Sequence, residues 1–144
     1  MKDLVISEAR AVAATRLWVQ RVVIGLSLCP WARQSTIRYA FSSEACPGGE
    51  AELLACVAKE VNLLRHSSRE PEPRGSNVPE TTILVCPHAF PGDFAEFYGL
   101  VQEAEEQLVV DGLDDDFQVV GFHPQYQFAG EGAYVLAAFF ESRC

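Results

Sequence analysis

The chain has 144 residues, of which 49% are hydrophobic, and its eleven basic and twenty acidic residues give a formal net charge of -9. This length predicts a single domain over 1–144, and the acidic balance argues against nucleic acids and anionic membranes as partners, because both attract basic surfaces. No stretch approaches the roughly 20 apolar residues that span a bilayer and no secretion signal opens the chain, so we expect a cytoplasmic protein.

The first predicted element is a long helix that Ser7 can cap. From Ala11 onward, apolar and small residues recur at close to the 3.6-residue period of a helix. We expect this helix to end near Cys29, because Pro30 disfavours helical geometry in the residue before it and lacks a backbone donor. Residues 36–41 have the composition of a strand.

A second amphipathic helix is predicted over residues 50–65, where leucines and valines recur on one face. Residues 66–80 follow with three prolines, a glycine and five charged residues but no periodicity. This composition predicts an exposed, flexible loop. We interpret it as an insertion rather than a linker between domains, because the preceding residues would make a poor core on their own.

The second half of the chain repeats the alternation of strand and helix. The most apolar strand is predicted at residues 81–86, and another at 117–122. Between them, Asp93 and Glu96 form an acidic version of a capping box at the start of a third helix. Gly112 has the position of a residue that ends such a helix in a left-handed conformation.

This order predicts the α/β class, with a small sheet of about three to four strands built from βαβ units and with helices packed on it. The alternative is a ferredoxin-like α+β plait, to which the tail GAYVLAAFF would add an antiparallel fourth strand. Seven consecutive apolar residues in that tail must be buried in the domain or against another molecule, so we also expect a possible homodimer.

Histidines follow two of the predicted strands. If the strands are parallel, their carboxyl ends share one edge of the sheet, where ligands of open α/β sheets bind. His88 and His123 would then lie at the same edge, each beside a proline, Pro87 and Pro124. His66 begins the predicted flexible loop and is expected to be solvated.

Three functional interpretations of this edge compete with a structural one. A zinc site could use Cys86, His88 and His123, with Cys29 as a further ligand, although C-x-H is a poor zinc signature. A nucleophilic site could pair Cys29 with His123, because an adjacent imidazole favours the thiolate. Against this, Cys29 lies near the carboxyl end of the predicted helix, where the helix dipole raises the pKa of a thiol.

The third interpretation is a binding cleft without covalent chemistry, in which Tyr126, Gln125 and Gln127 orient a ligand beside the imidazoles. In the structural interpretation, each histidine only caps a strand by bonding a backbone carbonyl, and the aromatic residues complete the core. No phosphate-binding loop is present, and the five cysteines contain no C-x-x-C pair, so we expect reduced thiols.

Two motifs, GLSLCPWA at 25–32 and FHPQYQFAG at 122–130, resemble those of the family known as domain of unknown function 1415. The resemblance covers most of the chain, including TTILVCP at 81–87, and implies no known activity or cofactor. It favours Cys29 and His123 over Cys86 and His88, because His88 lies outside the matched motifs.

The resemblance also implies a segment N-R-S-P-x-P and a helical tail with a further histidine, which this sequence lacks. We therefore expect a weakened site or one that a partner subunit completes.

Together these observations predict a protein that binds, and could transform, a small polar metabolite in a cleft at the strand exits. His123 is the candidate general acid or base and Cys29 its nucleophilic partner, with Tyr126, Gln127, His88 and Pro124 as ligand-binding residues. The alternative is a non-enzymatic interaction or structural module. The cofactor, the reaction and even the presence of a chemical step are left open by the sequence.

Overall fold

The computed structural model describes residues 6–29, 32–33, 35–67, 78–123 and 137–142. In chain order the helices are α1 (Glu8–Trp18), the π-helix η1 (Val19–Ile24), α2 (Glu50–Ser67) and α3 (Phe94–Val110). The strands are β1 (Ile37–Phe41), β2 (Thr81–Val85), β3 (Phe117–Phe122) and β4 (Ala137–Ser142).

The four strands form one mixed sheet in the order β1-β2-β4-β3. β1 and β2 are parallel neighbours, whereas β4 is antiparallel to both β2 and β3. It follows that β1, β2 and β3 run in the same direction, although β4 separates β3 from the other two. The predicted α/β class is confirmed, and the parallel pair β1–β2 distinguishes the sheet from that of a ferredoxin-like plait.

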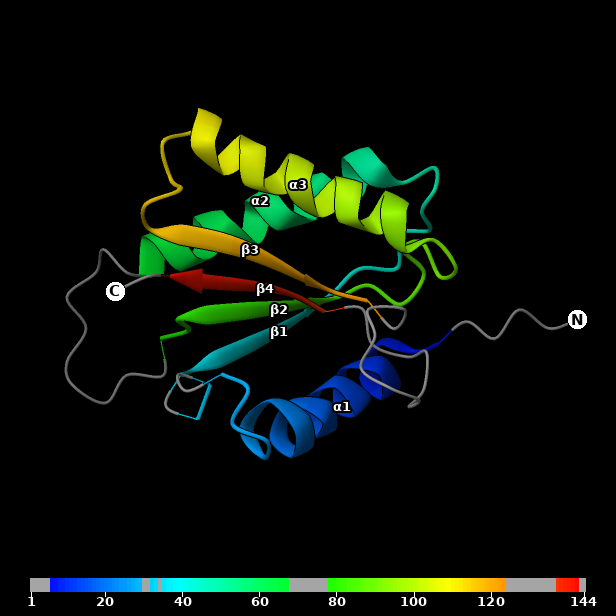
Figure 1. Cartoon of the computed structure of the whole chain (residues 1–144), viewed down its shortest axis with the longest axis vertical. Helices are drawn as coiled ribbons and strands as arrows, with labels where there is room; N and C mark the ends of the chain where they lie inside the picture. Colours follow the sequence, from blue (N-terminus) through cyan, green and yellow to red (C-terminus); the bar gives the residue numbers. More distant parts are fainter. Residues whose placement is uncertain (1–5, 30–31, 34, 68–77, 124–136, 143–144) are drawn as a thin grey trace, which may run out of the picture.

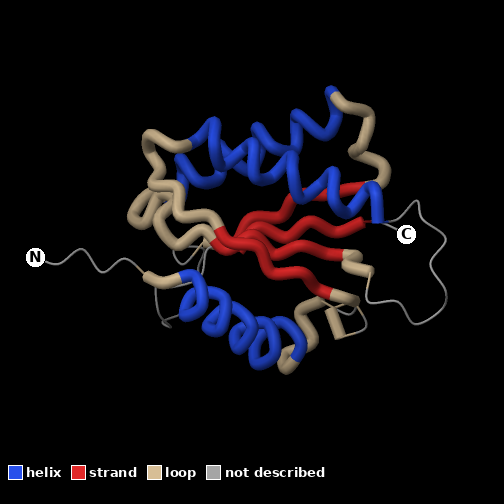
Figure 2. Tube along the Cα trace, turned by 180° about the vertical axis from the view of Figure 1, so that it is seen from behind, coloured by secondary structure: helices blue, strands red, loops and turns tan. Residues whose placement is uncertain are grey.

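Helices cover both faces of the sheet. α2 and α3 lie on one face and α1 lies on the other, as Figure 1 shows from one side and Figure 2 from behind. β2 is buried along its whole length because it contributes to both layers. Ile83 and Val85 pack in the core beneath α1, and Leu84 and Cys86 pack in the core beneath α2 and α3.

The described part of the apolar tail belongs to an inner strand. Ala137–Ser142 lies between β2 and β3 and pairs with both along its length. The tail thus adds the antiparallel strand that the alternative interpretation expected, but within a sheet that also holds a parallel pair. The backbone of β4 therefore has a pairing partner on each side within this sheet, and the expectation of a homodimer stays a prediction.

The first helix ends earlier than predicted. Ser7 caps it as expected, by accepting a hydrogen bond from the backbone N–H of Arg10, but the helix widens into η1 and does not reach Cys29. Ser27 takes a left-handed conformation with φ 53°, and the backbone N–H of Leu28 bonds the carbonyl of Val23. This is a Schellman end, which satisfies the last carbonyls without a proline.

The two later helices follow their sequence signals closely. Asp93 caps α3 through a bond from the Glu96 backbone N–H, and Gly112, at φ 68°, closes α3 with a second Schellman end. α2 runs two residues further than predicted, so His66 lies exposed in its last turn rather than in a loop. Residues 68–77 of the predicted flexible loop lie outside the described residues.

Candidate functional site

The loop that follows β2 is the centre of the strand-exit edge. Its residue Phe90 is buried with φ 50°, a left-handed conformation that is strained for a bulky side chain. Three hydrogen bonds hold this conformation. The Phe90 N–H donates to the Cys46 carbonyl in the loop after β1, and the Phe90 carbonyl accepts from Asp93 N–H and from His123.

His123 joins the end of β3 to this loop. Its Nε2 lies 2.8 Å from the Phe90 carbonyl oxygen, and the ring is buried. Because a carbonyl oxygen can only accept, Nε2 carries the hydrogen and donates it. The aromatic rings of Phe94 and Phe97 lie against the imidazole, with centroids 5.8 and 5.1 Å away. His123 is thereby fixed in position by α3 and by the neighbouring loop.

A close approach of α3 to β3 positions these aromatic rings. A Cβ atom at Gly121 would lie 2.6 Å from Val101 Cγ2 and 2.9 Å from Phe97 Cε1. Only glycine therefore allows α3 to come this near to β3. The same approach places Phe97 against His123, which follows Gly121 by two residues.

His88 lies at the same edge with a buried nitrogen that no described residue satisfies. Among the buried side-chain nitrogen and oxygen atoms of the described residues, only His88 Nε2 and Thr82 Oγ1 have no hydrogen-bond partner. The backbone of His88 is held, because its carbonyl accepts from the Cys46 N–H. An imidazole nitrogen can donate or accept, so Nε2 could bond a polar ligand group or a water molecule.

Cys29 is not brought to His123. The segment that joins η1 to β1 lies at the edge where β1 begins, opposite the edge where β3 ends (Figure 1). Cys29 is half-buried and packs in the core beneath α1, whereas His123 contacts aromatic residues of the other core. The described residues thus show no contact between this thiol and this imidazole, and their pairing stays a prediction.

The remaining sequence candidates divide into two groups. Cys86 is buried at the end of β2, where burial raises the pKa of its thiol to about 12, with smaller effects from Cys46 and Cys56. In the part of the chain that the structure describes, no three His, Cys, Asp or Glu side chains are grouped to hold a metal ion. Tyr126, Gln127, Gln125 and Pro124 lie outside the described residues.

Sequence reasoning missed Phe90 and Cys46, whose backbones hold the edge together. A backbone carbonyl that accepts a histidine leaves no trace in residue type, and a positive φ at phenylalanine contradicts the usual preference for glycine or asparagine. The predicted meeting of three strand exits was the available signal. That prediction indicates that the loops after the strands lie at one edge, but it does not identify the backbone atoms that form hydrogen bonds there.

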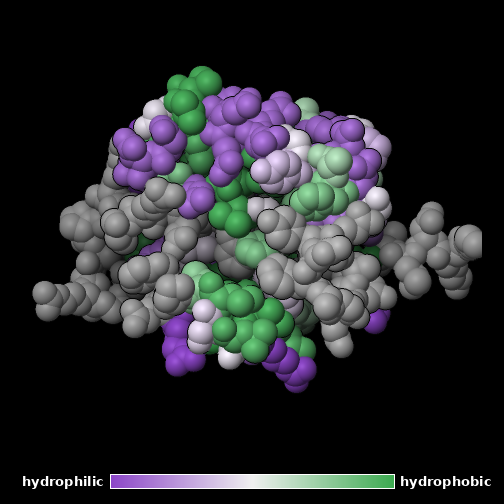
Figure 3. Space-filling view, viewed as in Figure 1, coloured by the Kyte–Doolittle hydropathy of each residue, from purple (hydrophilic) through white to green (hydrophobic). Residues whose placement is uncertain are grey.

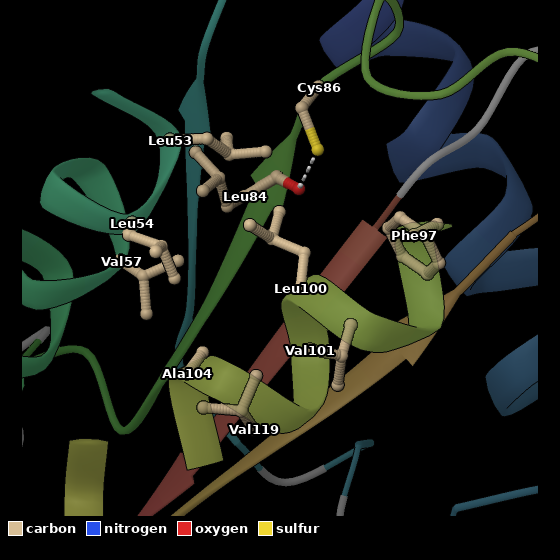
Figure 4. A pocket seen from close by; sticks show the side chains of 10 residues that line it. All are labelled: Leu53, Leu54, Val57, Leu84, Cys86, Phe97, Leu100, Val101, Ala104 and Val119. Carbon is tan, nitrogen blue, oxygen red and sulfur yellow. Dashed lines mark hydrogen bonds between the residues drawn. The ribbon is translucent and has the colours of Figure 1, made fainter. Parts of the chain in front are cut away.

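Deeper in the same layer, a cavity of about 20 Å³ lies between α2, α3 and the sheet. Figure 4 shows side chains from both helices and from β2 and β3 around it, with the Cys86 thiol directed toward the Leu84 carbonyl oxygen, 3.9 Å away. All polar groups of its lining belong to the backbone or to this thiol. The cavity is thus an apolar packing space behind the strand-exit edge.

None of the helices in the described part of the chain has the length and apolar character needed to cross a membrane.

Comparison with known proteins finds one family. A family model described as "Protein of unknown function (DUF1415)" matches residues 10–141. No curated protein and no solved structure matches the chain. The match includes both motifs that carried the resemblance, around Cys29 and around His123.

Proposed function

This chain belongs to the DUF1415 family of proteins of unknown function, and we propose that it binds a small polar metabolite at the strand-exit edge. The observation that carries the proposal is His88 Nε2, a buried nitrogen without a hydrogen-bond partner among the residues that the structure describes. Leaving such a group unpaired costs about 1–3 kcal/mol, and a native structure tolerates this where a ligand or water completes the bond.

The surroundings of His88 support a prepared binding position. Its loop is held to the neighbouring exits through Cys46 and through His123, so the loop backbone does not need to be ordered when a ligand arrives. Preorganisation of this kind lowers the entropic cost of binding. His123 acts as a positioning residue, because its Nε2 hydrogen is committed to Phe90.

A structural module is the second candidate, and the bond from His123 to Phe90 favours it. In that case His123 serves to tie β3 to the loop after β2, and a water molecule completes His88. The two candidates make different predictions for His88→Leu: the binding site loses its ligand, whereas the module has none to lose.

The test is a thermal-shift screen of the purified chain with small carboxylates, phosphate monoesters, amino acids and nucleosides. A compound at a hundred times its Kd stabilises the native state by about 2.7 kcal/mol. The proposal expects a compound that raises the Tm of the wild type and of His66→Gln, in which an exposed histidine is removed, but not that of His88→Leu. If no compound in these classes stabilises the wild type, the structural module stands instead.

We further infer that the protein works in the cytoplasm. Cys29, Cys46, Cys56 and Cys86 are thiols rather than halves of disulfides, and thiols remain reduced in that compartment. Fractionation of cells that produce the tagged protein tests this inference; its recovery in an oxidising compartment would contradict it.

A further inference from the structure

Charge is strongly segregated in this protein. Residues 9–33 contain four arginines and no acidic residue, whereas residues 94–116 contain eight acidic residues and no basic one. The first range includes most of α1 and all of η1, and the second includes α3 and the loop after it. These elements cover opposite faces of the sheet (Figure 1), so the arginines of α1 and η1 and the acidic residues of α3 lie on opposite sides of the sheet.

The basic face combines arginines with exposed leucines, and we define it as Arg10, Leu17, Arg21, Leu26 and Leu28. Both arginines are exposed, and the three leucines are 45%, 66% and 51% exposed. Arg10, Leu17 and Arg21 are spaced by seven and four residues, which places them on one side of a helix. Leu17 lies between the two arginines in the sequence, and Leu26 and Leu28 follow Arg21 in the turn after η1.

The acidic face has the same construction with the opposite sign, and we define it as Glu103, Glu106, Val109, Val110 and Asp111. The valines are 61% and 78% exposed, and the three acidic residues are also exposed. In Figure 3 an apolar area tops the molecule, where α3 ends in Figure 1, with hydrophilic residues beside it. Both faces thus present apolar side chains flanked by charge.

The acidic face lies where a positively charged partner would be stabilising. It occupies the last turns of α3, and the final turn contains no basic residue. The carboxyl end of a helix carries partial negative charge, so acidic side chains there are destabilising and a cation would be stabilising. Arginines of a docked surface would supply that cation.

We propose that the occupant of each face is a second copy of this chain, with the basic face of one copy on the acidic face of the next. We choose a second copy because the two faces are complementary in charge. The same chain presents arginines with exposed leucines on one face and acidic residues with exposed valines on the other. The two faces lie on opposite sides of the sheet, so the contact is head-to-tail rather than two-fold symmetric. Association of this kind continues into a chain or closes into a ring.

Sedimentation velocity of the full chain over a wide range of concentrations tests the proposal. We expect association at low ionic strength that weakens as salt is added, because salt screens the attraction between the exposed charges of the two faces. Arg21→Glu and Glu106→Arg each place like charges opposite one another, and each should weaken association by about tenfold or more. Glu52→Arg makes the same charge change on the exposed surface of α2, outside both faces, and should leave association unchanged.

The mixture of the two variants is the decisive measurement. The Arg21→Glu protein keeps a native acidic face and the Glu106→Arg protein keeps a native basic face, so an equimolar mixture should associate again. Circular dichroism of each variant establishes that it is folded. A chain that stays monomeric at low salt, single variants that associate like the wild type, or a mixture without recovery would each overturn the proposal, the first in favour of a different partner.

Discussion

His88 and His123 lie at one edge of the sheet but are held in different ways. His123 donates to the Phe90 carbonyl and packs against two phenylalanine rings. The Nε2 of His88 has no hydrogen-bond partner in the described part of the chain, although its main chain is fixed by Cys46. The proposed binding role of His88 fits this difference. A side chain that serves binding rather than folding can be removed without loss of stability in the ligand-free protein.

Substitution of each histidine by leucine separates the two roles. We expect His123→Leu to lower the free energy of unfolding by about 1–3 kcal/mol, because it removes a buried hydrogen bond. His88→Leu should be neutral or slightly stabilising, since it removes an unpaired polar atom. Urea unfolding of the three proteins measures both changes. A large loss of stability in His88→Leu would show that its ring is needed for folding.

The buried Cys86 thiol predicts a loss of stability in alkaline solution. Its pKa is raised by burial from about 9 to about 12, so above pH 9 the unfolded chain releases a proton that the native chain keeps. The free energy of unfolding should therefore decrease as pH rises from 9 toward 12, by up to about 1.4 kcal/mol per pH unit from this group.

Cys86→Ala provides the control for that pH dependence. It lacks the ionisable group, so its stability should decrease less steeply than that of the wild type above pH 9. Denaturant unfolding at several pH values compares the slopes. Tyr39 and Cys46 also have a raised pKa, and because both proteins retain them, only the difference between the slopes reports on Cys86. Equal slopes would contradict the prediction.

At the scale of elements, the contact between α3 and β3 places Phe97 against His123. Gly121 allows this contact, because a Cβ there would overlap Val101 and Phe97. We expect Gly121→Ala to lower the free energy of unfolding by about 1–3 kcal/mol, as overpacking does in cores. It should also change the NMR signals of the His123 ring.

Gly99→Ala is the matched control for this contact. Gly99 lies in α3, and the position that a Cβ would take there has no neighbouring atom within 4 Å, so alanine should stabilise the helix by roughly 0.5–1 kcal/mol. Thermal unfolding of the two variants tests this, because the same glycine-to-alanine change should lower the Tm at residue 121 and raise it at residue 99. If both variants lost stability equally, close packing at Gly121 would not be the cause.

The elements also mark how far periodicity can predict a boundary. Asp93 and Gly112 bounded α3 as expected, because caps are local interactions between residues a few positions apart. The end of the first helix was misplaced, since its apolar period continues to Cys29 while the backbone turns at Ser27. The local sequence pattern does not predict a left-handed conformation at Ser27, so this helix boundary could be located only from the structure.

At the scale of the whole molecule, the sheet depends on its last strand. β4 joins β2 to β3, so without it β3 has no partner among the described strands. A chain that ends at residue 136 should fail to fold, whereas one that ends at residue 142 should keep the sheet. Far-ultraviolet circular dichroism and cooperative unfolding measure this. A cooperative transition in the shorter chain would contradict the central place of β4.

The sequence by itself determined the α/β class, the limits of most elements and the common direction of the strands that precede His88 and His123. These follow from local periodicity, from capping and from the common direction of strands joined by helices. Only the tertiary structure decided that β4 lies inside the sheet, that Cys29 and His123 are apart, and that Phe90 accepts from His123. Such facts depend on contacts between residues distant in the chain, which residue type and spacing do not encode.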